Sequence, residues 1–465
     1  MVHRPPPPLP IRRLAAAACL VLSGALTLAA PAPVDDAARL RDSAMKGSGA
    51  LAIVTELVTE VGPRLAGSAG DRAAVRWATA RLSRAGLSDV HALPVTVPHW
   101  VRGTATAVLE GSPARPLAVV SLGGAPGTGD EPLRAELVVL TDFKALEALP
   151  ADALSGRIAY VANRMRRGDV HHAYADAVIA RNEGPALAAS KGALAYLLRS
   201  VGTDEGRTPH TGMTEFPAGL TPIPALAVSA ADADLIERRA AAGPAPVVTL
   251  QSSARLLAPE PSADVAGELA GDGTLPGVVL IGAHLDSWDL AEGAQDDGAG
   301  VAIAIATLER IRALGLRPHR TVRIVLYANE EQTGTGAVAY AEAASRLNEP
   351  HVAALEADFG GGRVTDLRVD ATLAAGRWVG ALATALKPLG IRRSPEPAHG
   401  GADLKELKDR GVPVVDLVQD GTHYFDVHHS ANDVVSTLSA ADLDQAVAAY
   451  AATVWLLANE ADLAR

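Results

Sequence analysis

The sequence predicts an α/β fold with a mixed, mostly parallel sheet sandwiched by helices, together with an inserted β-rich domain. Two patterns support this prediction. After Pro259, apolar runs alternate with amphipathic stretches, as strands and helices do in a sheet that is covered on both faces. Between residues 98 and 257 the chain instead consists of short β-branched runs separated by Gly, Pro and Asp, which is typical of strands and turns.

The N-terminal residues 1–32 have the pattern of a secretory signal peptide. Arg12 and Arg13 precede an apolar stretch over residues 14–30, and small residues follow it. This stretch is short for a membrane-spanning helix, which needs roughly 20 residues. We therefore expect cleavage near residues 29–32, a secreted or periplasmic protein, and no stable membrane span in the mature chain.

The only cysteine, Cys19, lies inside this stretch and raises the alternative of a lipoprotein anchor. Residues 16–18 are alanines, whereas a lipoprotein signal calls for a large aliphatic residue ahead of the cysteine. This disfavours the anchor. Without the signal the chain has no cysteine, so it can be exported without disulfide bonds, and any metal ion must bind to other side chains.

The charge balance argues against a nucleic-acid partner. The chain has 42 Lys and Arg against 53 Asp and Glu, a net charge of −11. Residues 1–34 contain Arg4, Arg12 and Arg13 and no acid, so their removal leaves 39 − 53 = −14. Nucleic-acid binding calls for a basic face, which this composition does not favour.

Residues 33–97 and 258–465 are expected to form one domain around the insertion of residues 98–257. Two N-terminal stretches have apolar residues at helical spacing, "SGALAIVTELVTEVG" and "SAGDRAAVRWATARLSRAG". After the insertion, strands are predicted for "GVVLIGAHLD", "TVRIVLYANEE", "HVAALEADF" and "VPVVDLV", with helices between them. A long final helix is expected over residues 439–458.

Metal-ligand side chains follow three of these predicted strands. His284 and Asp286 follow "VVLIGA", Glu330 and Glu331 follow "VRIVLYAN", and Asp358 follows "VAALEA". In open α/β sheets, ligands gather at the carboxyl ends of strands, so these side chains are expected at one rim. A set of His and carboxylates without Cys suits zinc and, less specifically, manganese or cobalt.

Asp296 is the candidate for a carboxylate that bridges two metal ions. Two ions about 3.5–4 Å apart need such a shared ligand. The glycines of "GAQDDGAG" around Asp296 allow backbone and ions to approach closely. Its neighbour Asp297 is expected to cap the following helix.

The adjacent Glu330 and Glu331 suggest a division of labour. One can bind a metal ion while the other takes a proton from the attacking water and returns it to a leaving amine. Asp286, two residues from His284, is placed to orient the imidazole through its other nitrogen rather than to bind metal.

These motifs resemble the di-zinc exopeptidase family of carboxypeptidase Q (plasma glutamate carboxypeptidase), glutamate carboxypeptidase and bacterial zinc aminopeptidases, and most closely the carboxypeptidase Q branch. The likeness covers most of the chain after the signal. It rests on "GAHLDSWDLAEGAQDDGAG", "YANEEQTGTGA", "ALEADFG" and "GGADLKELKDRGVPVVDLVQDGTHYFDVHHSANDV". It also implies a zinc exopeptidase fold and identifies the insertion as similar to a protease-associated domain.

The resemblance implies a role for each residue. Two zinc ions would share Asp296; His284 and Asp358 would complete one ion, and Glu331 and His429 the other. Glu330 would be the general base.

In the family pattern the ligand histidine directly precedes Ser or Thr, which selects His429, with His428 as the alternative ligand. His428 otherwise occupies a position where some relatives carry an oxyanion-binding tyrosine. Asp433 would steady the ligand histidine or its loop.

Several further residues are expected in structural or surface positions, or could fit either a structural role or a role in the site. Asp403 and His399 are expected on a loop near the substrate, although a lone histidine beside glycines is more often structural. His171, His172 and His210 are expected on the surface of the insertion. Trp288 fits either a substrate pocket or the core.

We expect a secreted zinc exopeptidase that hydrolyses a terminal bond of short peptides or splits dipeptides; a homodimer is an open possibility. The alternatives are a single-zinc amidohydrolase or cyclase acting on a modified amino acid, and a peptidase-like binding protein without catalysis. The sequence leaves open which peptide terminus is recognised. Carboxylate recognition needs a basic residue, and Lys191 and Arg199 are candidates in the insertion.

Overall fold

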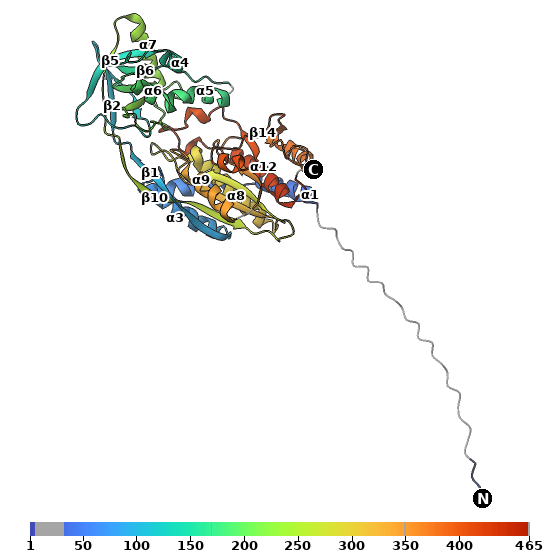
Figure 1. The fold of residues 1–465 in the computed structure, drawn as a ribbon. Helices are drawn as coiled ribbons and strands as arrows, with labels where there is room; N and C mark the ends of the chain where they lie inside the picture. Colours follow the sequence, from blue (N-terminus) through green and yellow to red (C-terminus); the bar gives the residue numbers. More distant parts are fainter. Residues whose placement is uncertain (5–31, 169, 348–349, 464–465) are drawn as a thin grey trace.

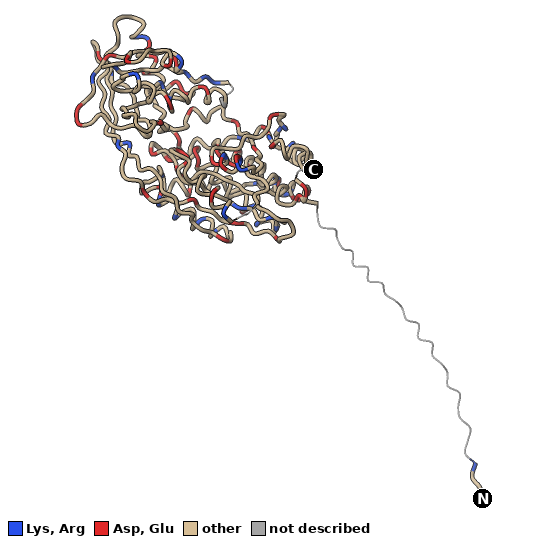
Figure 2. The backbone as a smooth tube through the Cα atoms, in the orientation of Figure 1, with Lys and Arg blue, Asp and Glu red and all other residues tan. Residues whose placement is uncertain are grey.

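The computed structural model describes residues 1–4, 32–168, 170–347 and 350–463, so the predicted signal lies almost wholly outside the described residues. Figure 1 shows two bodies, one with the strands of the insertion and one with the helices and sheet of the main domain. Among the described residues, no helix combines the length and apolar character needed to cross a membrane. Acidic and basic residues are interspersed over both bodies (Figure 2).

The main domain is built on a five-stranded mixed sheet. Its strand order is β1-β10-β12-β11-β13. Strands β12, β11 and β13 are parallel, while β10 runs antiparallel to both β12 and β1. The bounds are β1 Ser88–Val101, β10 Arg255–Leu269, β11 Val278–His284, β12 Thr321–Tyr327 and β13 His351–Glu356.

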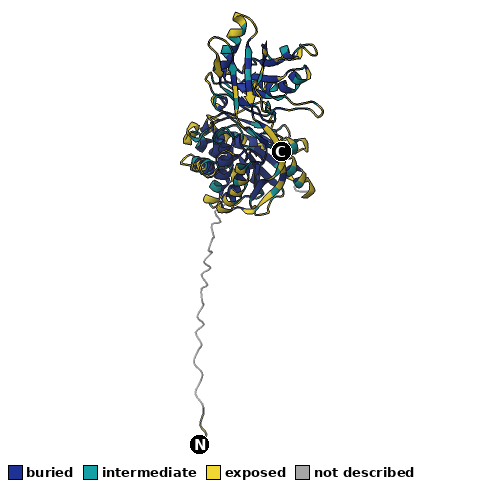
Figure 3. Cartoon of the chain, turned by 90° about the vertical axis from the view of Figure 1, so that its left-hand side faces the viewer, coloured by how far each residue is buried: buried dark blue, intermediate teal, exposed yellow. Residues whose placement is uncertain are grey.

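Helices cover both faces of this sheet, which confirms the predicted mixed α/β fold. Side chains alternate between the two faces of a strand, and on β11 Ile281 packs with one group of helices while Leu280 packs with another. Figure 3 shows this buried interior in each body, with exposed residues at the outside. The first group is α1 Pro33–Ala44, α2 Ala50–Glu60, α3 Ala69–Arg84, α8 Ala299–Ala313, α10 Arg377–Leu386 and α12 Ala440–Asn459, and the second is α9 Thr335–Leu347 and α11 Lys405–Asp409.

A small three-stranded sheet extends the main domain beyond β13. Its order is β15-β14-β16, and a bridge between Ala354 and Val414 links it to β13. The strands are β14 Val364–Val369, β15 Arg392–Arg393 and β16 Val415–Gln419.

The insertion contains an eight-stranded sheet of order β3-β2-β9-β5-β6-β7-β8-β4. Its strands are β2 Ala105–Leu109, β3 Arg115–Leu117, β4 Val119–Ser121, β5 Leu133–Leu140, β6 Ile158–Val161, β7 Ala195–Arg199, β8 Ala225–Val228 and β9 Val247–Ser252. The described part also contains helices that the β-rich prediction did not include: α4 Phe143–Glu147, α5 Val170–Asn182, α6 Gly184–Ser190 and α7 Ala230–Ala242.

Strands β1 and β10 join the two bodies as a long antiparallel pair, from Ser88 opposite Glu268 to Val101 opposite Arg255. The expected boundaries at residues 97/98 and 257/258 fall inside these strands. Strand β1 contains Pro94 and Pro98. Prolines are tolerated there because β1 is the edge strand of the sheet.

Candidate metal centre

The carboxyl ends of three neighbouring strands carry most of the side chains that the sequence singled out. β11 ends at His284, Glu330 and Glu331 follow β12, and Asp358 follows β13. Because β12, β11 and β13 are adjacent and parallel, these ends lie at one edge of the sheet. The structure thus brings together the residues of three separate motifs.

The carboxylate of Asp296 lies between two histidines. Asp296 belongs to the short segment 294–298 that leads from β11 into α8. Its Oδ1 is 3.1 Å from Nε2 of His284, and its Oδ2 is 3.2 Å from Nε2 of His429. The two oxygens of one carboxylate therefore face two separate groups of donor atoms.

Each group contains a second carboxylate. Oδ1 of Asp358 is 3.5 Å from Nε2 of His284, and Oε2 of Glu331 is 2.8 Å from Nε2 of His429. The donors of His284, Asp296 and Asp358 all lie within 4.8 Å of one another. One imidazole nitrogen with carboxylate oxygens is a donor set that zinc accepts.

The electrostatics of these groups fit bound cations. Burial lowers the pKa of His284, but Asp358 and Asp296 outweigh this effect and raise it well above its usual range. Burial, followed by the charge of Asp296, raises the pKa of Glu331. Oε1 of Glu331 is buried and has no hydrogen-bond partner within the described residues. Crowded carboxylates with a vacant lone pair are stabilised when a metal ion takes the place of protons.

His428 and His429 both approach Asp296. Nε2 of His428 is 3.5 Å from Oδ2 of Asp296, a longer distance than that of His429, and the two imidazole rings are stacked with centroids 3.6 Å apart. The donors of these three residues also lie within 4.8 Å of one another. We favour His429 as the ligand because it alone pairs with Glu331. Burial and the neighbouring His429 lower the pKa of His428, which keeps its imidazole neutral.

Asp286 supports the centre in a different way from the one expected. Nδ1 of His284 is 3.1 Å from the main-chain oxygen of Asp286 but 3.8 Å from its carboxylate. A carbonyl oxygen only accepts, so Nδ1 carries the proton and Nε2 faces the candidate metal position. The carboxylate instead accepts a hydrogen bond of 3.0 Å from the main-chain N–H of Glu330.

Asp433 and Asp297 fix the backbone around Asp296. The Asp433 carboxylate accepts hydrogen bonds from the N–H groups of Gln295 and Asp296, at 2.6 and 3.2 Å, and so holds the main chain at Asp296 rather than a histidine. Asp297 accepts from the N–H of Gly300 at 3.0 Å, which agrees with the expected cap of the following helix. These contacts fix where the Asp296 carboxylate points.

Glu330 is half-buried beside the two groups. Burial, and then the charges of Asp358 and Glu331, raise its pKa well above the usual range. A carboxylate with a raised pKa accepts a proton more readily, which suits a general base.

A cavity of about 340 Å³ opens over the centre and is shared by the two bodies. The main domain lines it with Asp296, Glu330 and His428, among others, while the insertion contributes Tyr174 and Arg181. Neither of these two residues was singled out in the sequence. Both lie on α5, and nothing in its local pattern indicates that this helix faces the centre.

The basic residues proposed from the sequence lie elsewhere. Arg199 pairs with Asp234 and Glu237 at 2.7 and 3.1 Å. The Lys191 ammonium donates to main-chain oxygens of Glu147 and Leu149. Neither residue lines the cavity over the centre.

The expectation of a surface position for His210 is wrong. Its side chain is buried, with Nδ1 2.7 Å from the carbonyl oxygen of His428 and Nε2 2.7 Å from Oδ1 of Asp204. The next residue, Thr211, donates its N–H to the carbonyl of His429 at 2.8 Å. The insertion thus holds the loop that carries both histidines of the centre.

The remaining residues singled out from the sequence differ in position. His399 and the exposed His172 line an adjoining cavity of about 580 Å³, whereas the side chain of His171 lies outside the described part. Asp403 is buried, and burial followed by the charge of Glu356 raises its pKa well above the usual range. The buried Trp288 packs edge-on against Trp100 and His429, which places it in the core beside the centre.

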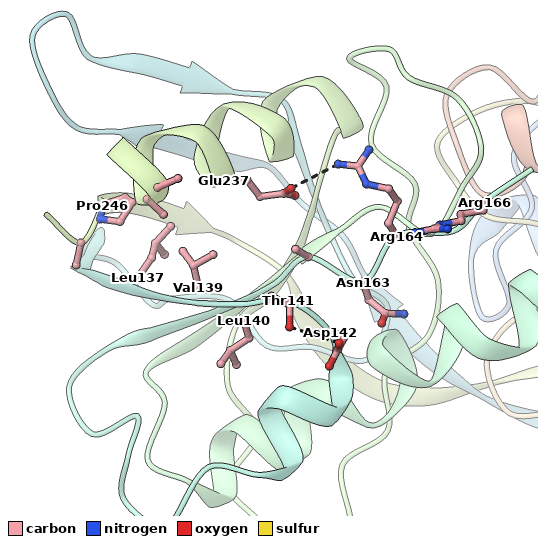
Figure 4. Close-up of a pocket in the computed structure, with 14 residues that line it drawn as sticks. Leu137, Val139, Leu140, Thr141, Asp142, Asn163, Arg164, Arg166, Glu237 and Pro246 are labelled. Atoms are coloured by element: carbon pink, nitrogen blue, oxygen red, sulfur yellow. Dashed lines mark hydrogen bonds and ion pairs between the residues drawn. The ribbon is translucent and has the colours of Figure 1, made fainter. Parts of the chain in front are cut away.

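A larger cavity of about 770 Å³ lies within the insertion, away from the centre (Figure 4). Its lining includes Arg164, which pairs with Asp234 at 2.6 Å and with Glu237 at 3.4 Å. These charges are already matched, and none of the side chains of the centre lines this cavity.

The chain is similar in sequence to known proteins. Residues 264–454 match the model of Peptidase family M28. The chain is 34% identical to carboxypeptidase Q of Bos taurus over 403 residues. The aligned residues cover 87% of this chain and 84% of the relative. The chain is also 33% identical over 404 residues to carboxypeptidase Q of Homo sapiens, with the same coverage.

Solved structures are similar over nearly the whole chain. A Peptidase M28 precursor from Shewanella amazonensis SB2B superposes with a TM-score of 0.89 at 38% identity, covering 93% of this chain and 98% of the other. A zinc aminopeptidase from Bacillus subtilis has a TM-score of 0.60 at 18% identity, covering 89% and 96%, and this likeness concerns the fold alone.

Proposed function

Because this chain belongs to peptidase family M28, we propose that it is an exopeptidase with two zinc ions that hydrolyses a terminal bond of short peptides or dipeptides. Its relatives in cattle and humans are both named carboxypeptidase Q. One observation carries the proposal: the two oxygens of Asp296 face different histidines, at 3.1 and 3.2 Å. This is the arrangement that a bridging ligand requires.

Each ion would have three protein ligands. His284, Asp358 and Oδ1 of Asp296 would hold one, and His429, Glu331 and Oδ2 of Asp296 the other. A catalytic zinc site has three protein ligands and an open position, so this set leaves room for water and substrate. The single-zinc alternative would use one of these groups and leave the other without a role.

The bound ions would polarise the scissile carbonyl and acidify a water molecule. Glu330 would take the proton from that water and later give it to the leaving amine, since its pKa is raised. Asp286 holds the main chain of Glu330 and thereby keeps this carboxylate at the centre. The neutral imidazole of His428 lines the cavity, where it would donate a hydrogen bond to the substrate oxygen as negative charge develops.

The proposed domain 98–257 would limit the length of the substrate. Its helix α5 contributes residues to the cavity, whose volume of about 340 Å³ suits one or two amino acids rather than a long chain. The main domain would then consist of residues 33–97 and 258–465, with the long β1–β10 pair as the connection.

Export is proposed from the signal pattern of residues 1–32. N-terminal sequencing of protein expressed in a bacterial host should find a mature start near Pro31, in the periplasm or the medium. Recovery of active protein with an intact Met1 from the cytosol would contradict export.

The reaction is tested with a panel of dipeptides, tripeptides and longer peptides. Metal-loaded protein should release single terminal residues, lose this activity after chelation, and regain it when zinc is restored. Internal cleavage of long peptides, or activity that survives complete chelation, would contradict a zinc exopeptidase.

A further inference from the structure

The guanidinium of Arg181 stands at the wall of the cavity over the metal centre. Arg181 lies on α5 of the insertion, and its side chain is 6% exposed. None of its hydrogen-bond partners is a carboxylate. They are Oδ1 of Asn182 at 3.2 Å, the hydroxyl of Tyr174 at 3.1 Å, the carbonyl of Thr211 at 3.5 Å and Nδ1 of His429 at 3.2 Å.

Other buried arginines have partners of a different kind. Arg64 donates to four main-chain carbonyl oxygens, and Arg199 pairs with two carboxylates. Within the described residues, Arg181 has no carboxylate within 4.0 Å and only one main-chain carbonyl, at the limit of hydrogen-bond distance. A buried cation is costly unless an anion or a full set of acceptors compensates it. Arg181 is therefore a buried cation without an anionic partner among the described residues, at the wall of a cavity that could admit an anion.

Metal binding would free Arg181 further. A neutral imidazole that binds an ion through Nε2 carries its proton on Nδ1. Nδ1 of His429 could then no longer accept the hydrogen bond from Arg181, because both groups would be donors. The guanidinium would need another acceptor in the same place.

We propose that Arg181 binds the free terminal carboxylate of the peptide substrate, so that the enzyme recognises the carboxyl end. This inference rests on the proposed function. Only the imidazole of His429 separates Arg181 from the candidate metal position. One residue spans about 3.8 Å along the chain, so the carboxylate of the residue after the scissile bond comes within reach of the guanidinium. A guanidinium also matches a carboxylate with two parallel hydrogen bonds.

Tyr174 and Asn182 hold the guanidinium for this role. The Tyr174 ring stacks on Phe425 with centroids 4.6 Å apart, and its hydroxyl accepts from Arg181. The opposite specificity, recognition of a free amine, would call for a carboxylate. Glu215 is the acidic residue that the insertion contributes to this cavity, but it lies at the exposed edge.

The test compares alanyl-alanine with alanyl-alanine amide, which differ only in the charge of the carboxyl end. The wild type should prefer the free acid. Arg181→Ala should lower kcat/KM for the acid by about 10- to 100-fold, mainly through KM, and leave the amide nearly unchanged. Arg181→Lys should restore part of the preference. Arg164→Ala, an exposed arginine of the insertion, is the matched control and should behave as wild type.

Equilibrium binding gives a second readout. In metal-loaded Glu330→Gln protein, calorimetry should find tighter binding of the dipeptide than of its amide, and Arg181→Ala should remove this difference while the metal content stays the same. An acid-to-amide ratio that Arg181→Ala leaves unchanged would overturn the inference alone. If the wild type hydrolyses no peptide at all, the proposed function fails and this inference with it.

Discussion

His210 of the insertion contacts the main chain of His428, with 2.7 Å between Nδ1 of the first residue and the carbonyl oxygen of the second. Since the other ring nitrogen lies 2.7 Å from Asp204, the imidazole links the insertion to the loop of the metal centre. The insertion thus holds the loop of the two candidate histidines, besides lining the cavity.

His210→Ala is expected to weaken the metal site that contains His429. The variant loses one buried and one partly buried hydrogen bond, and leaving the buried carbonyl of His428 unsatisfied costs about 1–3 kcal/mol. Metal titration should show one of two ions binding more weakly, about 10-fold or more, while the ion of His284 keeps its affinity. Equal weakening of both ions would contradict a local role, and His91→Ala at an exposed position is the control.

The bridging role of Asp296 predicts a pattern of metal loss. Asp296→Asn should lower the metal content of both sites, because it removes the oxygen charge that faces both histidines. Asp358→Asn and Glu331→Gln should each lower the content of one site only. Elemental analysis of the three purified variants checks this pattern. If Asp296→Asn protein retains both ions, the residue is not the bridge.

Glu330→Gln should separate catalysis from metal binding. The amide keeps the size of the side chain but cannot take a proton, so turnover should fall by about 100- to 10,000-fold. The metal content should stay at the wild-type value, since Glu330 is not among the proposed ligands. Turnover close to that of the wild type would remove Glu330 as the base.

The buried Asp264 predicts how stability depends on pH. Burial raises the pKa of its carboxyl from 3.8 to about 7, and its Oδ2 has no hydrogen-bond partner within the described residues. Between pH 4 and 7 the folded chain therefore holds a proton that the unfolded chain has released. Stability from this group falls as pH rises, by at most about 1.4 kcal/mol per pH unit.

Asp264→Asn should remove this contribution and flatten the dependence. Urea unfolding at pH 5 and pH 7, in one metal state, measures it in the variant and the wild type. Asp130→Asn, at an exposed position, should leave the dependence unchanged. A slope in Asp264→Asn equal to that of the wild type would show that Asp264 does not titrate in this range.

The strand ends of the main domain were predictable from the sequence because each is marked by a short apolar run followed by a ligand residue. For His284, Glu331 and Asp358 this pattern was sufficient to expect one rim, and the structure places them together. The family prediction is confirmed by the comparisons, on motifs that lie within the matched residues 264–454.

Contacts that depend on how the insertion folds back were not predictable. Arg181 lies on a helix without a distinctive pattern, and His210 lies in an irregular segment between β7 and β8. Their roles follow only from the tertiary approach of these segments to the loop of His428 and His429. Similarly, the sequence could not separate the carboxylate of Asp286 from its main-chain oxygen, which is the group that faces His284.

The proposed bridge of Asp296 between two metal ions can be tested on the wild-type protein itself. The measurement is the number of metal ions per chain in purified, active protein, obtained from elemental mass spectrometry and the protein concentration. We predict close to two zinc ions per chain, with peptidase activity that rises only as the second ion binds. Full activity in protein that holds no metal, or saturation at one ion per chain, would contradict a two-metal centre bridged by Asp296.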